Sequence, residues 1–345
     1  MCLEVATMAS SVCLEIISTS SSPAEESEMQ FLISPRFIES GEIEKTSAKK
    51  TSYKFELVDY DSLPEFLKHN EFILNHYRSE WPLKQTLLSI FSIHNETLNI
   101  WTHLIGFFIF LVLAFHASTL FPVNLAVSGN SSSTFGASTS GPIVSLWPFY
   151  LYLIGAMFCL LSSCACHLLC CHSSFTCYLT LRLDYAGISV LIVSSFYPLV
   201  YYSFACLPFY RNLYLCSITL LGITTIIVSL SPFFESAKFR AARAVLFACM
   251  GASGLVPIVH KMVAFGDRKE AVVSTLYEVA MGLCYGVGAV VYGARVPERW
   301  IPGKFDIAGH SHQLFHVLVV AGAYMHYLAS LVYLEWREIE AIEAC

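Results

Sequence analysis

Charged side chains are scarce in this sequence: Asp, Glu, Lys and Arg make up only 13% of its 345 residues. Soluble domains carry about 25% charged residues, so this composition cannot supply a water-exposed surface of ordinary polarity. Hydrophobic residues reach 55%, and the mean hydropathy is +0.59. These values exclude an ordinary soluble protein and predict a membrane protein.

An excess of basic residues is also missing. The chain has 20 Lys and Arg against 26 Asp and Glu, a net charge of -6, so we expect no nucleic-acid partner. Its 13 cysteines show no CxxC spacing. Most lie within apolar runs, where Cys behaves as a small hydrophobic residue, and this pattern does not indicate a disulfide scaffold.

Seven apolar runs are long enough to cross a bilayer, which takes roughly 20 residues. We expect spans near Ile100–Leu120, Trp147–Leu169, Asp184–Cys206, Asn212–Leu230, Ala242–Val263, Val273–Gly293 and His312–Leu334. The predicted fold class is therefore all-α, a seven-transmembrane helix bundle. Pro198 and Pro257 are expected to kink the third and fifth helices.

The orientation of this bundle follows from the Lys and Arg residues that flank the spans. With the N-terminus in the cytoplasm, the inner flanks hold more of them than the outer flanks, as the positive-inside rule requires. The first outer loop then contains Asn130-Ser131-Ser132, a glycosylation acceptor. The sequence thus predicts a cytoplasmic N-terminus and an outer or lumenal C-terminus, in the plasma membrane or an endomembrane.

Four regions are expected along the chain. Residues 1–52 are rich in Ser, Glu and Lys, which predicts a disordered cytoplasmic arm. Residues 1–30 contain no Lys or Arg, and because a signal peptide begins with basic residues, we expect none here. Residues 53–99 form a cytoplasmic or interfacial helical segment, 100–335 the membrane domain and 336–345 a short outer tail. A cytoplasmic signalling partner would bind through residues 1–99.

The segment 53–99 contains Ser62-Leu63-Pro64-Glu65, which has the form of a helix capping box. Apolar residues follow at helical spacing as far as Tyr77, so we expect an amphipathic helix. Two arrangements are open: the helix lies on the cytoplasmic membrane surface, or it packs beneath the bundle.

Ionisable side chains at membrane depth are costly, so each needs a partner or a function. His167 ends the second predicted span, Asp184 opens the third, and two histidines, His312 and His316, open the seventh. In the predicted orientation these helix ends all lie on the cytoplasmic side. The side chains can therefore meet in one layer.

The histidine pair has metal-ligand spacing, because residues four apart share one helix face. With His167, His312 and His316 supply three nitrogen ligands, which suits a tetrahedral Zn²⁺ that keeps its fourth position for water. Asp184 could hold that water as a general base, and Ser163 could hydrogen-bond to the water or to a substrate. The alternative is a set of packed polar histidines without metal.

Three blocks of the sequence resemble the progestin and adipoQ receptor family, which includes adiponectin receptors and haemolysin III-related proteins. The blocks are Glu96-Thr97-Leu98-Asn99-Ile100-Trp101-Thr102-His103, then Ser163-Cys164-Ala165-Cys166-His167 with Asp184, and Ser311-His312-Gln313-Leu314-Phe315-His316-Val317. They match the family's ExxNxx[ST]H, SxxxH…D and HxxxH motifs. The Glu56–Trp81 stretch is most similar to the plant heptahelical members.

This resemblance implies seven helices with an internal N-terminus and a Zn²⁺ bound by His167, His312 and His316, with Asp184 associated with the zinc-bound water. It also implies a receptor, credited in some members with ceramide hydrolysis, and a plant-type hormone or stress response. Glu96, Asn99 and His103 share one helix face, which we interpret as a structural network. The long polar first loop departs from the animal receptors, so an adiponectin-like ligand is not expected.

Two hypotheses remain open. The first is a zinc-dependent, ceramidase-like amide hydrolase acting on a sphingolipid or other lipid-like substrate. The second is a signalling receptor whose zinc only ties the second and seventh helices together. Asp184 and Ser163 favour the first, although an Asp that orients a ligand would give the same sequence. A G-protein-coupled receptor is disfavoured, because the third span lacks an acidic-Arg-Tyr ending and the seventh lacks NPxxY.

Overall fold

The computed structural model describes residues 56–120, 144–231 and 240–343. All of these except Glu56 fall within one compact unit that begins at Leu57. The predicted arm over 1–52 and the glycosylation acceptor at 130–132 lie outside the described residues. The predicted boundaries of the four regions stay predictions.

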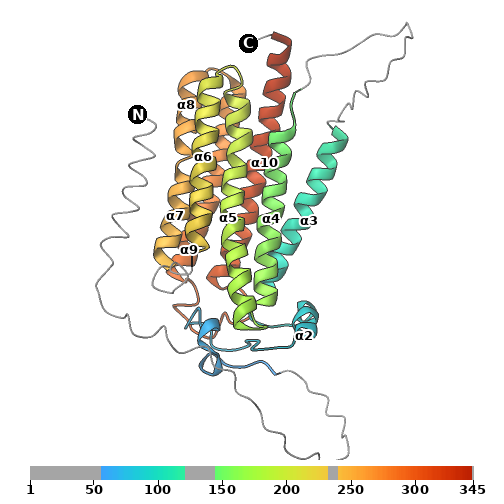
Figure 1. Cartoon of the computed structure of the whole chain (residues 1–345), viewed down its shortest axis with the longest axis vertical. Coiled ribbons are helices and arrows are strands. Elements are labelled where there is room, and N and C mark those ends of the chain that lie inside the picture. Colours follow the sequence, from blue (N-terminus) through green and yellow to red (C-terminus); the bar gives the residue numbers. More distant parts are fainter. Residues whose placement is uncertain (1–55, 121–143, 232–239, 344–345) are drawn as a thin grey trace, which may run out of the picture. The chain divides into compact units, whose positions relative to one another are not determined.

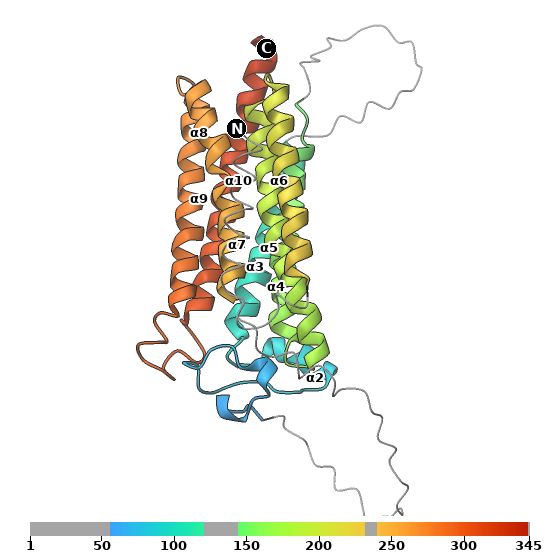
Figure 2. The same ribbon diagram turned by 60° about the vertical axis from the view of Figure 1, so that its left-hand side comes forward.

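Seven stretches of the described chain are helical, long and apolar enough to cross a membrane. They are α3 (Thr97–Leu120), α4 (Trp147–Leu169), α5 (Ser174–Ser203), α6 (Pro208–Ser229), α7 with α8 (Arg240–Ala252 and Leu255–Phe265), α9 (Lys269–Ala294) and α10 (Ser311–Glu343). These helices run side by side, with α4 against α3 and α5, and α10 against α9 (Figure 1 and Figure 2). The described part of the chain contains an isolated bridge but no strand. The predicted fold class is confirmed, whereas the membrane side of each terminus stays a prediction.

The fifth span is interrupted between α7 and α8, at Ser253 and Gly254. Pro257 explains the position of this break, because a proline ring clashes with the carbonyl four residues earlier and cannot donate to it. That carbonyl belongs to Ser253. The structure thus confirms that Pro257 disturbs the fifth helix, while α5 continues through Pro198 as one helix.

The third span begins earlier than predicted, because α5 starts at Ser174 and not at Asp184. Ser173 caps this helix: its hydroxyl oxygen accepts a hydrogen bond from the Thr176 backbone N–H at 3.2 Å. Asp184 therefore lies within the helix and not at its beginning. Hydropathy does not predict this first part of α5, because Arg182 and Asp184 interrupt the apolar run.

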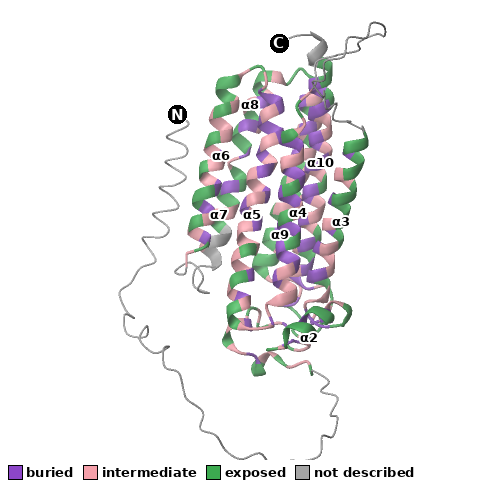
Figure 3. Ribbon diagram, turned by 45° about the vertical axis from the view of Figure 1, so that its right-hand side comes forward, coloured by how far each residue is buried: buried purple, intermediate pink, exposed green. Residues whose placement is uncertain are grey.

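The bundle has an aromatic interior and an apolar exterior. Large side chains such as Phe110, Phe149, Tyr202 and Trp336 are fully buried between the helices. Outward-facing apolar side chains are exposed along the length of the helices, including α3 and α6 (Figure 3). An exposed apolar face of this extent is what lipid contact requires, so the chain is a multi-pass membrane protein.

The segment 57–96, called the cap segment below, lies across the end of the bundle where α4 ends and α10 begins (Figure 1). Its predicted amphipathic helix over 63–77 does not form. Short elements occur instead: η1 (Tyr60–Ser62), η2 (Glu65–Leu67), α2 (Leu83–Leu88) and η3 (Ser89–Phe91). Pro64 explains the difference, since the residue before a proline is pushed out of the helical region, and Leu63 is extended with ψ 144°.

The apolar residues of the cap segment nevertheless pack together under the bundle. Leu63, Leu67, Ile73 and Tyr77 form a buried cluster with Cys177 of α5. Val58 and Tyr77 pair in an antiparallel bridge, in which the Val58 N–H donates to the Tyr77 carbonyl at 2.8 Å. The apolar spacing read as a helix face therefore identified the buried residues but not their backbone conformation.

Polar contacts fasten the cap segment to the loop between α9 and α10. The Asp306 carboxylate accepts hydrogen bonds from the Leu74 N–H at 2.9 Å and from the Asn75 side chain at 3.0 Å. Buried Glu298 accepts one from the Asn70 side chain at 3.1 Å. Glu298 also accepts the N–H of Ser311 at 2.8 Å, where α10 begins. Through Glu298, the cap segment thus helps to position the beginning of α10, which carries the histidine pair.

Candidate metal centre

Three histidines from two helices meet at the cap-segment end of the bundle. Their ring centroids form a nearly regular triangle: 4.9 Å from His167 to His312, 4.8 Å from His167 to His316, and 4.7 Å from His312 to His316. One ring nitrogen from each lies within 4.8 Å of the others. The structure therefore brings the three sequence-predicted ligands together.

The hydrogen bonds of these rings leave nitrogens available for a metal. Nδ1 of His167 contacts the Glu96 carboxylate at 2.7 Å, and Nδ1 of His316 contacts the Asn99 carbonyl at 3.1 Å. Within the described chain, the buried Nε2 of His167 has no hydrogen-bond partner. A tetrahedral Zn²⁺ with bonds of about 2.0 Å separates its nitrogen ligands by roughly 3.3 Å, so small side-chain movements would complete a site. The residues present fit a zinc ion.

Glu96 connects the first of the three sequence blocks to this centre. Its carboxylate accepts a second hydrogen bond, from the Asn99 side chain at 2.6 Å. A carboxylate on the non-ligating nitrogen of a histidine fixes the tautomer and makes the ring a better ligand. The network that we expected around Glu96 and Asn99 is present, and it reaches two of the three histidines.

His103, the last residue of that block, lies flat against His316. The ring centroids are 3.6 Å apart and the planes differ by 4°. Neither ring nitrogen of His103 has a hydrogen-bond partner within the described residues, although the side chain is buried. The stacking restricts the His316 ring to one plane.

Asp184 of α5 lies within interaction range of the Ser163 hydroxyl of α4. This contact depends on close helix packing. A Cβ atom at Gly187 would clash with the Ser162 hydroxyl and lie 3.1 Å from the Cys159 Cα. Asp184 is not among the three ligands that lie within 4.8 Å of one another, but its carboxylate interacts electrostatically with His167.

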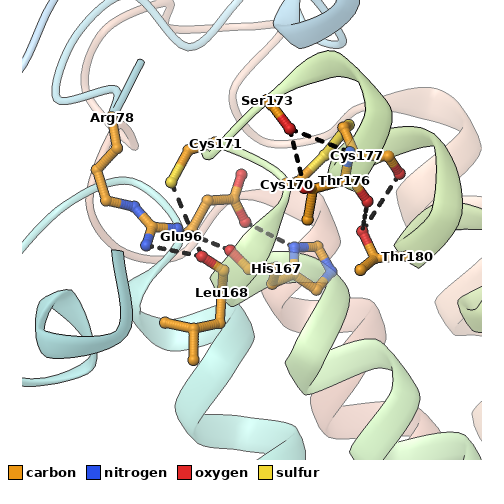
Figure 4. Close-up of a disulfide and its surroundings, with 10 residues drawn as sticks. All are labelled: Arg78, Glu96, His167, Leu168, Cys170, Cys171, Ser173, Thr176, Cys177 and Thr180. Atoms are coloured by element: carbon orange, nitrogen blue, oxygen red, sulfur yellow. Dashed lines mark hydrogen bonds and ion pairs between the residues drawn. A yellow bond between two sulfur atoms is a disulfide. The ribbon is translucent and has the colours of Figure 1, made fainter. Parts of the chain in front are cut away.

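Arg78 of the cap segment holds the end of α4 just beyond the site (Figure 4). Its guanidinium donates to the carbonyl of His167 at 2.7 Å and to that of Leu168 at 3.1 Å. Carbonyls at a helix C-terminus lack intrahelical partners and attract cations. Arg78 is buried, at 3% exposure. In the sequence, Arg78 is only one of the Lys and Arg residues near the spans, since its contact with α4 depends on the tertiary structure.

The cysteines after Ser163 differ in part from expectation. Cys164 and Cys166 are free and buried, as small hydrophobic residues would be. Cys170 and Cys177 instead form a disulfide across the turn from α4 to α5 (Figure 4). The apolar pattern favoured small hydrophobic cysteines here, and this pair differs because the turn brings the two side chains together.

Comparisons with known proteins agree with the sequence blocks. Residues 91–327 match a family profile described as Haemolysin-III related. Heptahelical transmembrane protein 4 of Arabidopsis thaliana is 51% identical over 348 residues, covering 83% of this chain and 90% of that protein. Heptahelical transmembrane protein ADIPOR3 of Oryza sativa subsp. japonica is 46% identical over 384 residues, covering 87% and 95%. An adiponectin receptor protein of Drosophila melanogaster is 39% identical over 270 residues, covering 78% and 57%.

Proposed function

Because the chain belongs to the haemolysin-III-related family, we propose that it is a zinc-binding receptor of the adiponectin-receptor type with ceramidase-like hydrolytic chemistry. Membership in this family confirms the resemblance drawn from the three sequence blocks. The zinc ligands that we propose are His167, His312 and His316. The proposed setting, a hormone or abiotic stress response, follows from the similarity to plant members alone.

The observation that carries this proposal is the unpartnered Nε2 of His167. A buried nitrogen without a hydrogen bond is costly, and this one belongs to a triangle of imidazoles from α4 and α10. Glu96 holds the opposite nitrogen of the same ring at 2.7 Å. The donor set of three neutral nitrogens matches that of catalytic zinc sites.

A Zn²⁺ ion bound there would polarise an amide carbonyl and make a nearby water more acidic. The Asp184 carboxylate, which lies near the Ser163 hydroxyl, accepts the proton of the attacking water. The water oxygen bonds to the carbonyl carbon, the C–N bond breaks, and Asp184 returns the proton to the leaving amine. The products are a fatty acid and an amine.

The substrate class that we propose is a sphingolipid amide or a related lipid. The three histidines lie near the end of α4 and the beginning of α10, and Asp184 lies within α5. The helices of the bundle carry exposed apolar side chains. A lipid substrate can therefore present its amide at this depth while its chains remain in the membrane.

The test is ceramide hydrolysis by detergent-purified protein, with fatty-acid release followed by mass spectrometry. Asp184→Asn should retain its zinc but lose at least about 100-fold in rate, the usual range for a general base. Asp267→Asn is the matched control, since this carboxylate is exposed between α8 and α9. Equal rates for wild type and Asp184→Asn would overturn the proposed role of Asp184 as a general base. Zinc-loaded wild type that hydrolyses no ceramide would overturn the hydrolase and support a receptor whose zinc is structural.

A further inference from the structure

A second cluster of metal-ligating side chains lies beside the histidine centre and shares none of its ligands. It consists of His69, Cys170 and Cys177, with one ligand atom from each within 4.8 Å of the others. Cys170 caps the C-terminus of α4, and Cys177 lies at the beginning of α5. His69 follows η2 in the cap segment. The cluster therefore joins three separate parts of the fold.

Contacts of the α4–α5 turn and of the cap segment position these groups without a metal. The Ser173 cap starts α5 and sets the turn that brings Cys170 and Cys177 together (Figure 4). Leu67, two residues before His69, packs in the buried cluster that contains Cys177. The His69 N–H donates to the Leu67 carbonyl at 3.0 Å. The imidazole is thus held near the cysteine pair by the packing of the cap segment.

The chemistry of the cluster depends on its redox state. As a disulfide, the two sulfurs are bonded to each other and offer no thiolate. A thiol reductant of the glutathione class would break the S–S bond: two reductant molecules form their own disulfide, and Cys170 and Cys177 each gain a proton. The predicted orientation places this end of the bundle in the cytoplasm, where such reductants keep thiols reduced.

We propose that reduced Cys170 and Cys177, together with His69, bind a thiophilic divalent cation such as Zn²⁺ at a second site. Two thiolates and an imidazole are soft and borderline ligands that favour such ions. On binding, the two thiols release their protons and both sulfurs bond to the metal. Because His69 is exposed, solvent can occupy the fourth position. The bound ion links the cap segment to the turn between α4 and α5, where Cys170 follows His167 by three residues.

Cobalt provides a direct test, because a thiolate ligand on Co²⁺ gives a near-ultraviolet charge-transfer band and an all-histidine site gives none. Full-length protein in detergent is reduced, freed of reductant without air, and titrated with Co²⁺. The reduced protein should bind one more cobalt than the oxidised protein and should show the band. A reduced wild type without the band overturns the proposal.

Three variants assign the band to this cluster. Cys170→Ser with Cys177→Ser should abolish it, and His69→Ala should weaken the thiolate-bound cobalt at least tenfold. The matched control, Cys216→Ser with Cys249→Ser, removes two exposed free cysteines and should keep it. A band that survives loss of Cys170 and Cys177, or an affinity unchanged in His69→Ala, contradicts the proposed ligands.

His312→Ala separates this proposal from the proposed function. It removes a ligand of the histidine centre and should leave the thiolate band intact. Loss of the band in His312→Ala would mean that the two sites are not independent and would overturn the second site as stated.

Discussion

The Glu96 carboxylate lies 2.7 Å from Nδ1 of His167 and so links the beginning of α3 to the end of α4. Because Glu96 is held in turn by Asn99, the histidine ring has one tautomer and one orientation. The nitrogen that remains, Nε2, is the one directed to the proposed metal. The three sequence blocks thus converge on one centre.

Replacing Glu96 should weaken metal binding without abolishing it. In Glu96→Gln the charge that makes His167 a strong ligand is lost, and we expect an affinity for Zn²⁺ that is lower by about 10- to 100-fold. Competition with a chelator of known affinity measures this change. Glu65→Gln, which removes an exposed carboxylate paired with Lys68, should leave the affinity unaltered. An equal loss of zinc affinity in both variants would show that the net charge of the protein matters, and not the contact with His167.

The close approach of α4 and α5 should be sensitive to one methyl group. Gly187→Ala places a Cβ atom against Ser162 and the Cys159 backbone, and overpacking of this kind costs about 1–3 kcal/mol. We expect a lower melting temperature in detergent and a disturbed Ser163–Asp184 contact. Gly286→Ala is the matched control, because no atom lies within 4 Å of its added Cβ. This variant should keep or slightly raise the melting temperature, and an equal loss in both would contradict the packing argument.

A buried ion pair fastens α8, α9 and α10 to one another. Nζ of Lys261 donates to Glu278 at 2.8 Å, to Ser274 at 2.9 Å and to Tyr333 at 2.6 Å. Both charged side chains are 0% exposed. Removing one partner leaves an uncompensated charge, which typically costs about 3–5 kcal/mol.

We therefore expect Lys261→Met alone and Glu278→Gln alone to lower the melting temperature strongly. The double variant should recover most of the loss, because the amide introduced by Glu278→Gln would still accept a hydrogen bond from the Tyr333 hydroxyl. Lys269→Met, at the exposed beginning of α9, serves as the control. Additive losses in the double variant would show that the two side chains do not act as a pair.

His94 should make stability sensitive to acid. Its Nδ1 accepts the Glu96 N–H at 3.1 Å and its Nε2 donates to the Ser89 carbonyl at 3.2 Å. Burial, together with the charge of Arg78, lowers the pKa of His94 to about 4. Since the folded pKa lies below the unfolded one of about 6.5, this residue favours the folded state above pH 6.5, and its contribution is lost as the pH falls towards 4.

Thermal unfolding in detergent between pH 7 and pH 4, a range set roughly by the two pKa values, measures this effect. The free energy of unfolding of His94→Gln should decline less steeply with falling pH than that of wild type, by on the order of 1 kcal/mol per pH unit. His116→Gln, exposed on α3, should decline like wild type. Parallel curves for wild type and His94→Gln would contradict a neutral, buried His94.

The spans and the histidine trio could be predicted from the sequence because each depends on local patterns. An apolar run predicts a span wherever it lies, and the spacing of His312 and His316 puts both rings on one helix face. The beginning of α5 could not be located this way, because Arg182 and Asp184 interrupt the apolar run that hydropathy follows. The break before α8 lies at Ser253, four residues before the proline that causes it.

The supporting residues could not be predicted, because their roles depend on contacts between distant parts of the chain. Arg78 meets the carbonyl of His167, and Glu298 meets both Asn70 and Ser311. Nothing in the local sequence distinguishes these two from surface charges. Only their burial in the folded chain shows that they position the helices carrying the ligands.

The proposed function requires His167, His312 and His316 to bind one zinc ion. Metal content by mass spectrometry on detergent-purified protein tests it most directly, with His312→Ala beside wild type and His172→Ala as a matched control outside the trio. Cys170→Ser with Cys177→Ser in every sample removes the second proposed site. We expect about one zinc per chain in wild type and His172→Ala, as a single three-histidine site holds, and its loss in His312→Ala. Wild type without zinc, or His312→Ala with its zinc intact, would show that the three histidines do not form a zinc site.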